Sequence, residues 1–398
     1  MKTQRCRRGT SRLAGAAFVW ALAMAPAMLA PASAVAQTFK ALYSFTGGAD
    51  GGGPWGTPLL YGGNLYGTTY YGGGPSSTQS GTVFEFNPST GTETTPYVFL
   101  GQPFDGSAPM SGLVADPYGD LYGTTTEGGF SLRGTVFEIS GGSEFVLVNF
   151  SGNNGETPEG NLIIDPLGDL YGTTTDGGAN DSGSVFAFSA GGSLITLYSF
   201  GNYLTDAIGP ASGLLLEKGI LYGVTTEGGA HGWGTVFSVD PKTKQETILY
   251  IFQGTSMGGT PVGGLAADKK GNLYGTASVG GNANGNSGDG VVFKFNIASL
   301  QYSLVHTFKG SDGADPLGTL IGDGMGNFYG TTFAGGAAGF GTVFEFNSHG
   351  FTTLYSFSNG DDGAYPYAGL TVDSSGNLYG TATRGGQYDW GTLFEITP

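Results

Sequence analysis

One motif recurs seven times along this chain and restricts the folds that it can adopt. A Leu-Tyr-Gly or Phe-Tyr-Gly tripeptide begins at seven positions, separated by steps of 49 to 56 residues: Leu65, Leu121, Leu170, Leu221, Leu273, Phe328 and Leu378. Tandem repeats of this length are typical of solenoids and propellers, in which each unit buries its apolar face against its neighbour.

Each repeat contains four short apolar segments, which we label A to D. They are typified by GLVAD at 112 (A), LYGTT at 121 (B), GTVFEI at 134 (C) and TLYSF at 196 (D). All are rich in Val, Phe, Tyr and Thr and are bounded by Gly, Asp, Asn or Pro, a composition typical of strands separated by turns. Between A and B, an Asp followed by a Gly, as in 116–120 and 373–377, predicts a tight hairpin.

These segments predict an all-β fold, a seven-bladed β-propeller with four antiparallel strands per blade. The first segment, at 41–45, is of type D, whereas the last, at 391–396, is of type C. We therefore expect the N-terminal strand to complete the last blade, so that residues 37–398 form one propeller domain. The alternative is an open array of hairpin sheets, which would leave exposed strand edges.

Residues 1–36 have the pattern of a signal peptide. A basic start is followed by an apolar run, Leu13 to Leu29, and Ala34-Val35-Ala36 fits an A-x-A cleavage site. The alternative is a membrane anchor, but the apolar run is short and contains Pro26, so we expect no membrane span in the mature protein. We predict a secreted or extracellular location, with the periplasm or the cell surface as other destinations. Because the single cysteine, Cys6, lies in this segment, we expect no disulfide and no thiolate metal site.

The mature chain is strongly acidic. Beyond residue 36 it carries 10 basic and 31 acidic side chains, a net charge near −21. Such a charge opposes binding to nucleic acid or anionic lipid and favours cations or basic partners. We expect an extracellular glycan or protein partner, no nucleic acid, and a monomeric chain.

The repeat resembles a known family. LYGTTTEGG at 121, GTVFEI at 134 and the DGAYP turn at 362 are similar to the GloVer tandem repeat of choice-of-anchor proteins, and the similarity covers nearly all of residues 39–398. This resemblance implies an exported bacterial repeat protein, which in that family often carries a C-terminal anchor. The sequence stops at Pro398, directly after a strand and without an apolar tail, which favours release over attachment.

The D–A loops supply candidate metal ligands. In a propeller the D–A and B–C loops share one face, and the D–A loops here repeat a D-G-x-x-P pattern whose aspartates are Asp50, Asp105, Asp206, Asp312 and Asp362. These side chains form turns or, alternatively, a ring of carboxylates that binds a hard cation such as calcium. An oxygen-rich insertion at 282–289 is a second calcium candidate, and we expect no other cofactor.

The same face carries candidate ligand-binding residues. They are aromatic or acidic side chains of the D–A and B–C loops: Trp55, Glu127, Phe130, Asp176, Glu227, Trp233, Phe340, Tyr388 and Trp390. Aromatic faces flanked by carboxylates suit sugar rings, because the rings stack and the carboxylates accept hydroxyl bonds. In the alternative interpretation, the aromatic residues before segment C only cover blade edges.

No catalytic constellation is evident in the sequence. The three histidines lie in different kinds of segment, which argues against a metal cluster or a catalytic triad. We therefore predict an exported, non-enzymatic binding or scaffold module for glycan or protein ligands. The alternative is an extracellular carbohydrate-active hydrolase or lyase, which would need two acids at a defined separation.

Overall fold

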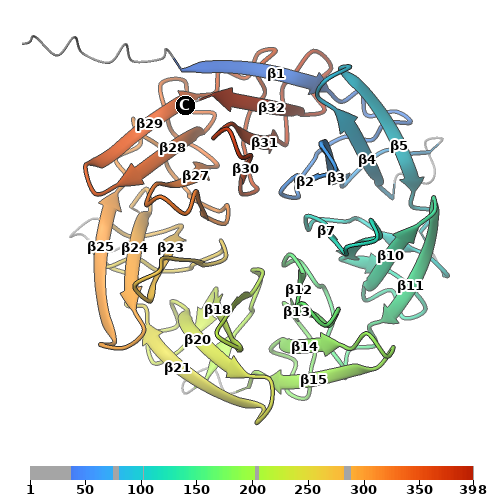
Figure 1. The fold of residues 1–398 in the computed structure, drawn as a ribbon. Coiled ribbons are helices and arrows are strands. Elements are labelled where there is room, and N and C mark those ends of the chain that lie inside the picture. The colour runs from blue at the N-terminus through green and yellow to red at the C-terminus, as the bar shows by residue number, and fades with distance from the viewer. Residues whose placement is uncertain (1–36, 75–79, 102, 202–205, 282–287, 398) are drawn as a thin grey trace, which may run out of the picture. The chain divides into compact units, whose positions relative to one another are not determined.

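The computed structural model describes residues 37–397, except 75–79, 102, 202–205 and 282–287. Residues 37–398 form one compact unit, in which seven four-stranded antiparallel sheets are arranged as a ring (Figure 1). The predicted seven-bladed β-propeller is thereby confirmed. Within the described ranges, no helix has the length and apolar character needed to cross a bilayer. The predicted signal peptide lies outside the described residues.

In every blade the strands follow the order A, B, C, D from the central channel to the outside (Figure 1). Blade 1 contains β2 (Leu59–Tyr61), β3 (Asn64–Thr69), β4 (Thr82–Asn87) and β5 (Thr92–Val98), and blade 2 contains β7 (Val114–Ala115), β8 (Leu121–Thr125), β10 (Thr135–Ser140) and β11 (Ser143–Asn149). Blade 3 contains β12 (Ile163–Ile164), β13 (Leu170–Thr174), β14 (Ser184–Phe188) and β15 (Leu194–Ser199). Blade 4 contains β17 (Leu215–Glu217), β18 (Ile220–Thr225), β20 (Thr235–Asp240) and β21 (Gln245–Ile251). Blade 5 contains β22 (Ala266–Ala267), β23 (Asn272–Ala277), β24 (Val291–Asn296) and β25 (Gln301–Thr307). Blade 6 contains β26 (Ile321–Gly322), β27 (Phe328–Thr332), β28 (Thr342–Asn347) and β29 (Gly350–Ser356). Blade 7 contains β30 (Thr371–Val372), β31 (Leu378–Ala382), β32 (Thr392–Thr397) and β1 (Thr38–Ser44). The A strands are shorter than the five-residue segments predicted for them, because only two or three of their residues pair with strand B.

The ring closes as predicted. Strand β1 pairs antiparallel with β32, from Thr38 opposite Thr397 to Ser44 opposite Thr392. The two ends of the propeller therefore share one blade, and no open sheet edge remains between blades 7 and 1.

The Gly of each B-strand motif is needed for packing inside the blade. In blade 1 a Cβ on Gly67 would lie 2.6 Å from the ring of Phe84, which belongs to strand C and is fully buried. The same contact recurs in each of the other blades, for example between Gly123 and Phe137. Because any larger residue would displace this ring, the Leu-Tyr-Gly motif reflects a steric requirement.

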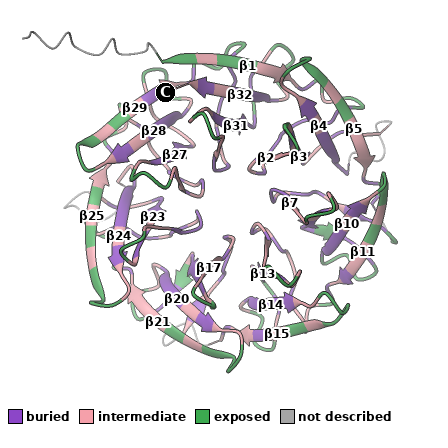
Figure 2. Cartoon of the chain, in the orientation of Figure 1, coloured by how far each residue is buried: buried purple, intermediate pink, exposed green. Residues whose placement is uncertain are grey.

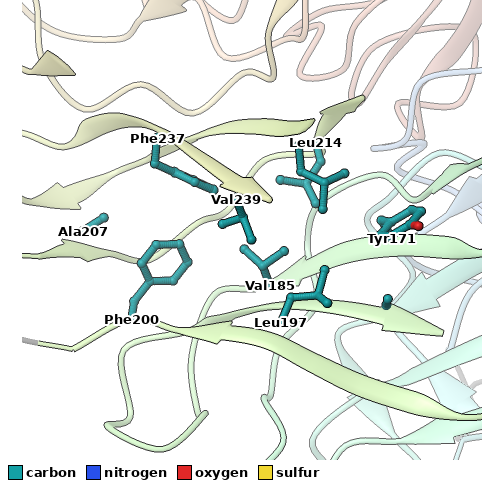
Figure 3. Close-up of a cluster of buried hydrophobic side chains, with 10 residues drawn as sticks. Tyr171, Val185, Leu197, Phe200, Ala207, Leu214, Phe237 and Val239 are labelled. Carbon is teal, nitrogen blue, oxygen red and sulfur yellow. The ribbon is translucent and has the colours of Figure 1, made fainter. Parts of the chain in front are cut away.

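The blades are joined by aromatic pairs. The Phe that follows each D strand packs edge to face on the C-strand Phe of the next blade, with ring centroids 5.0 to 5.3 Å apart: Phe45–Phe84, Phe99–Phe137, Phe150–Phe186, Phe200–Phe237, Phe252–Phe293, Phe308–Phe344 and Phe357–Phe394. Figure 3 shows the cluster between blades 3 and 4, in which Phe200 and Phe237 contact Val185 and Val239. Burial is concentrated in the B and C strands and decreases toward the outer D strands (Figure 2). The core is thus a ring of interblade clusters around the channel.

A second interblade contact explains the repeated proline. The residue before it has a positive φ and donates its N–H to the carbonyl that precedes strand C of the previous blade, as from Thr260 to Trp233 at 2.9 Å. The proline ring then contacts the Gly that begins that strand, as Pro261 contacts Gly234. All seven blades repeat this arrangement, so the D-G-x-x-P loop connects neighbouring blades in addition to making a turn.

Candidate functional site

The D–A and B–C loops lie on one face of the ring, which we call the loop face. In each blade the D–A loop that leads into the blade forms an antiparallel bridge with the start of its B–C loop. The seven bridges are Gly52–Tyr71, β6 (Gly106–Ser107) with β9 (Glu127–Gly128), Glu156–Asp176, β16 (Ala207–Ile208) with β19 (Glu227–Gly228), Gly259–Val279, Ala314–Ala334 and Ala364–Arg384. Side chains from every blade are therefore gathered at this end of the channel.

The five D–A aspartates bond within their own loops. Asp105 accepts hydrogen bonds from the Tyr97 hydroxyl at 2.9 Å and from the Leu100 and Gly106 backbone N–H groups, both at 2.6 Å. Asp50, Asp206 and Asp362 accept a tyrosine hydroxyl in the same way, whereas Asp312 lies 3.0 Å from Nε2 of His306. Within the described ranges, no group of three or more His, Cys, Asp or Glu side chains is arranged to hold a metal ion. Residues 282–287 of the second calcium candidate lie outside the described residues.

Two of the predicted aromatic residues pack on the next blade. Trp390 lies over Gly47 and Gly52, where a Cβ would come within 2.3 and 2.7 Å of its ring, and Trp233 lies over Gly254 at 2.2 Å. The aromatic residue thus occupies space that only glycine leaves free, which supports the predicted covering role for these two side chains.

The other predicted ligand-binding residues are spread over the loop face. Phe130 is 64% exposed and packs edge to face on Phe104, with ring centroids 5.5 Å apart at the rim of blade 2. The remaining members with exposed side chains are Glu127, Asp176, Glu227 and Tyr388. Trp55 and Phe340 are half-buried and belong to a larger aromatic group.

The central channel has a narrow opening on the loop face, which we call the channel mouth. Its rim consists of the residues that follow the seven repeated prolines: Trp55, Met110, Glu159, Ala211, Val262, Leu317 and Tyr367. The pocket here has a volume of about 50 Å³ and continues into a wider, apolar section of about 220 Å³ lined by A-strand residues such as Leu59, Val114 and Ile163. A ligand group that enters the mouth meets aromatic and aliphatic side chains and one carboxylate.

Glu159 is the only charged residue that lines the mouth. Among the described residues no cation pairs with its carboxylate, and the Thr175 hydroxyl is the hydrogen-bonding group beside it. Burial, and secondarily the Asp176 carboxylate, raise the pKa of Glu159, and the adjacent Thr175 hydroxyl partly offsets this rise. A carboxyl group without a cation partner and with a perturbed pKa in a concave pocket is typical of a binding or catalytic site.

Blades 3 and 4 also contribute two buried hydroxyl groups on the side of Glu159. The Oγ1 of Thr175 and the Oγ of Ser212 are buried and make no hydrogen bond of good geometry with any described residue. Ser212 is 5% exposed and lines the mouth, and its counterpart in blade 2, Ser111, is bonded to Thr124 at 2.9 Å. Blades 3 and 4 thus supply a polar side of the mouth with unused bonding capacity.

The opposite side of the mouth is aromatic. Trp55 lies 4.7 Å from Tyr367 and 5.8 Å from Tyr70, measured between ring centroids. The contacts extend in both directions, with centroids 4.6 to 6.4 Å apart, and form what we call the aromatic arc: Trp390, Tyr71, Tyr70, Trp55, Tyr367, Phe333, Tyr365 and Phe340. All eight side chains are half-buried and belong to blades 6, 7 and 1, across the ring from blades 3 and 4 (Figure 1).

Two members of the aromatic arc replace a hydrogen bond of the repeat. At the first position after strand B, Thr126 and Thr226 donate their hydroxyls to D–A loop carbonyls at 2.8 and 3.0 Å. Blades 1 and 6 have Tyr70 and Phe333 at this position, which cannot make the same short bond. Tyr70 and Phe333 instead pack on neighbouring rings of the arc, Tyr71 and Tyr365.

Sequence reasoning identified Trp55, Phe340 and Trp390 but not Glu159, Tyr70 or Tyr367. Glu159 and Tyr367 each follow a repeated proline, and a blade-by-blade alignment of that position would have identified the only charged residue among the seven. That these positions face one channel becomes evident only from the closed ring.

The sequence matches the profile of the Gloeobacter/Verrucomicrobia repeat over residues 29–165, 134–286 and 219–398, which confirms the resemblance predicted above. No curated protein sequence matches the chain. Among solved structures, an oligogalacturonate lyase from Vibrio parahaemolyticus is similar, with a TM-score of 0.56 and 9% identity over 92% of this chain and 94% of that chain. An oligogalacturonate lyase in complex with manganese has a TM-score of 0.50 and 10% identity over 84% of this chain and 86% of that chain. At these identities the likeness shows the shared fold alone.

Proposed function

The chain belongs to the Gloeobacter/Verrucomicrobia repeat family and folds into a seven-bladed propeller, and from these premises we propose that it binds a glycan on its loop face. The binding site consists of the channel mouth and the aromatic arc. In this proposal the protein is an exported, non-enzymatic binding module, in keeping with the signal peptide predicted at residues 1–36. The partner is an extracellular glycan, with a protein ligand as the other outcome of the test.

The aromatic arc is the observation that supports this proposal. Half-buried aromatic rings expose a face or an edge while their other atoms are fixed by neighbours, so little conformational entropy is lost when a ligand binds. The arc continues over three blades and reaches the mouth through Trp55 and Tyr367. A chain of sugar rings, which have apolar faces and polar rims, fits a row of aromatic surfaces that passes a mouth with one carboxylate.

The test compares binding of a panel of soluble oligosaccharides to the wild type and to Trp55→Ala with Tyr367→Ala. Truncation of an aromatic anchor at the centre of an interface costs roughly 2 kcal/mol or more, about thirtyfold in affinity. The matched control is Phe145→Ala, because Phe145 is 52% exposed on the outer strand of blade 2, away from the arc. Equal affinity of all three proteins, or binding to a peptide panel alone, would contradict the proposal. Circular dichroism establishes that each variant is folded.

A second candidate function is a carbohydrate-active hydrolase or lyase. The observation that favours it is the raised pKa of Glu159 beside the Asp176 carboxylate, since a general acid must hold its proton near neutral pH. In this case the wild type would release shorter products from an oligosaccharide that it binds. Glu159→Gln would abolish product release and leave binding in place, whereas a binding module releases no product in either form.

A further inference from the structure

Resting on the glycan-binding function above, we propose that the channel mouth selects glycans that carry free primary ammonium groups. The ligand class is an oligosaccharide that contains 2-amino sugars without N-acetyl groups. Glu159 binds the ammonium, while Trp55 and Tyr367 contact the sugar rings.

The negative charge of Glu159 has no counterion at the mouth. A half-buried carboxylate without a cation is unfavourable, and proteins normally pair such a group with a cation or with several hydrogen-bond donors. No Lys, Arg or His lines the mouth, where every lining residue is described. In the loops of this face the Lys and Arg residues are Arg133, which pairs with Glu156, and Lys309 and Arg384. We therefore expect the ligand to supply the positive charge, and we expect the Glu159 carboxylate to repel a polyuronate.

The composition of the mouth suits an organic cation better than a metal ion. Calcium needs six to eight oxygen ligands, whereas Glu159 is the only carboxylate in the mouth. Organic cations are bound by aromatic faces together with a carboxylate, and Trp is the best such face. The mouth has this combination, with Trp55 and Tyr367 on one side and Glu159 on the other. The Glu159 carboxylate is close enough to Tyr367 for its charge to contribute, after burial, to the raised pKa of that tyrosine. The combination favours an ammonium group over a metal ion.

The hydroxyl groups on the Glu159 side of the mouth suit a ligand with both an ammonium and hydroxyls. An ammonium ion has three N–H donors, and neighbouring sugar hydroxyls both donate and accept. The buried Ser212 hydroxyl at the mouth has no partner among the described residues and is available to a bound group, and the Thr175 hydroxyl lies beside the Glu159 carboxylate. An amino sugar supplies the cation and the hydroxyl groups on one ring, whereas a lysine side chain supplies the cation alone. The aromatic arc then accommodates the following sugar rings.

The test is a calorimetric titration with two glucosamine oligomers of equal length, one free of acetyl groups and one fully N-acetylated, at a pH where the free amine is protonated. The wild type is expected to bind the free amine about tenfold or more tightly, because a hydrogen bond between charged groups contributes more than a neutral one. Glu159→Gln is expected to remove this preference and to retain the affinity for the acetylated oligomer. The control Glu217→Gln, at the end of β17 on the opposite face, is expected to keep the preference.

The outcomes separate the two proposals. Equal affinity for both oligomers, or a preference that survives in Glu159→Gln, overturns the ammonium site and leaves glycan binding intact. Binding of neither oligomer, together with no binding to other glycans, overturns glycan binding itself. Glu159-dependent binding of a lysine peptide without any oligosaccharide binding overturns the assignment to amino sugars. A second readout is proton release on binding, expected for the wild type and absent in Glu159→Gln, because a bound cation lowers the pKa of this carboxyl group.

Discussion

Replacement of Glu144 and Glu246 by Gln is expected to stabilise the protein at pH 8 and to leave its stability unchanged at pH 4. Each residue lies near the start of a D strand and faces a tyrosine–aspartate pair of the preceding blade: Tyr97 with Asp105 for Glu144, and Tyr198 with Asp206 for Glu246. Oε1 of each glutamate is buried and has no partner among the described residues.

The magnitude follows from the two pKa values. Burial, and secondarily the neighbouring aspartate, raise the pKa of each glutamate from 4.5 to about 7. The folded state therefore holds the proton more tightly than the unfolded state. The contribution of each glutamate to the free energy of unfolding is complete below pH 4.5 and is lost as the pH rises to about 7. A shift of about 2.5 pH units corresponds to about 3.4 kcal/mol per site. Because both side chains are partly accessible to solvent, which screens the charge, we expect about 1–2 kcal/mol per site.

Urea unfolding followed by tryptophan fluorescence measures this difference. Gln resembles the protonated acid, so each variant is expected to unfold at a higher urea concentration at pH 8, with an unchanged dependence on urea, and to match the wild type at pH 4. The control is Glu127→Gln, because Glu127 is exposed on the loop face. Stabilisation of equal size at both pH values, or none at pH 8, would refute the argument from buried charge.

Two further predictions concern glycine and threonine positions with positive φ. Gly254→Ala is expected to destabilise the fold by about 1–3 kcal/mol more than Gly271→Ala. A Cβ at 254 would lie 2.2 Å from Trp233, whereas a Cβ at 271 would have no neighbour within 4 Å. Equal unfolding midpoints of the two variants in urea would contradict this prediction. Thr260→Gly is expected to stabilise by about 1 kcal/mol, because Thr260 has a φ of 51° and precedes Pro261, and this strain exceeds the entropic cost of glycine. A lower midpoint for Thr260→Gly would show that the threonine is not strained.

The fold was predictable because the repeat encodes it locally. Each turn motif works as expected from its residues: Asp116 accepts hydrogen bonds from the backbone N–H groups of Tyr118 and Asp120, and Gly119 has a φ of 93°. Matching D and C segments at the two ends of the chain were sufficient to predict the closure by β1. The turns depend on neighbouring residues, and the ring closure depends on the number and order of the segments. Both can be read from a single sequence.

The candidate site was only partly predictable because it depends on distant residues. Tyr97 and Asp105 are eight positions apart, and their bond could have been anticipated from the repeat. Glu159 and Tyr367, in contrast, are brought together only by the closed ring and the inward position of the residue after each proline. The sequence revealed many acidic and aromatic loop residues, and the structure distinguishes those that share the mouth from those, such as Phe130, at the rim.

The pairing of β1 with β32 also has a consequence for biosynthesis. Strand β1 has no partner until β32, at the other end of the ring, has been synthesised, so a chain that stops before β32 leaves β1 unpaired. Because unpaired strand edges promote association and cleavage, we expect the chain to be most vulnerable to both before this one pair forms.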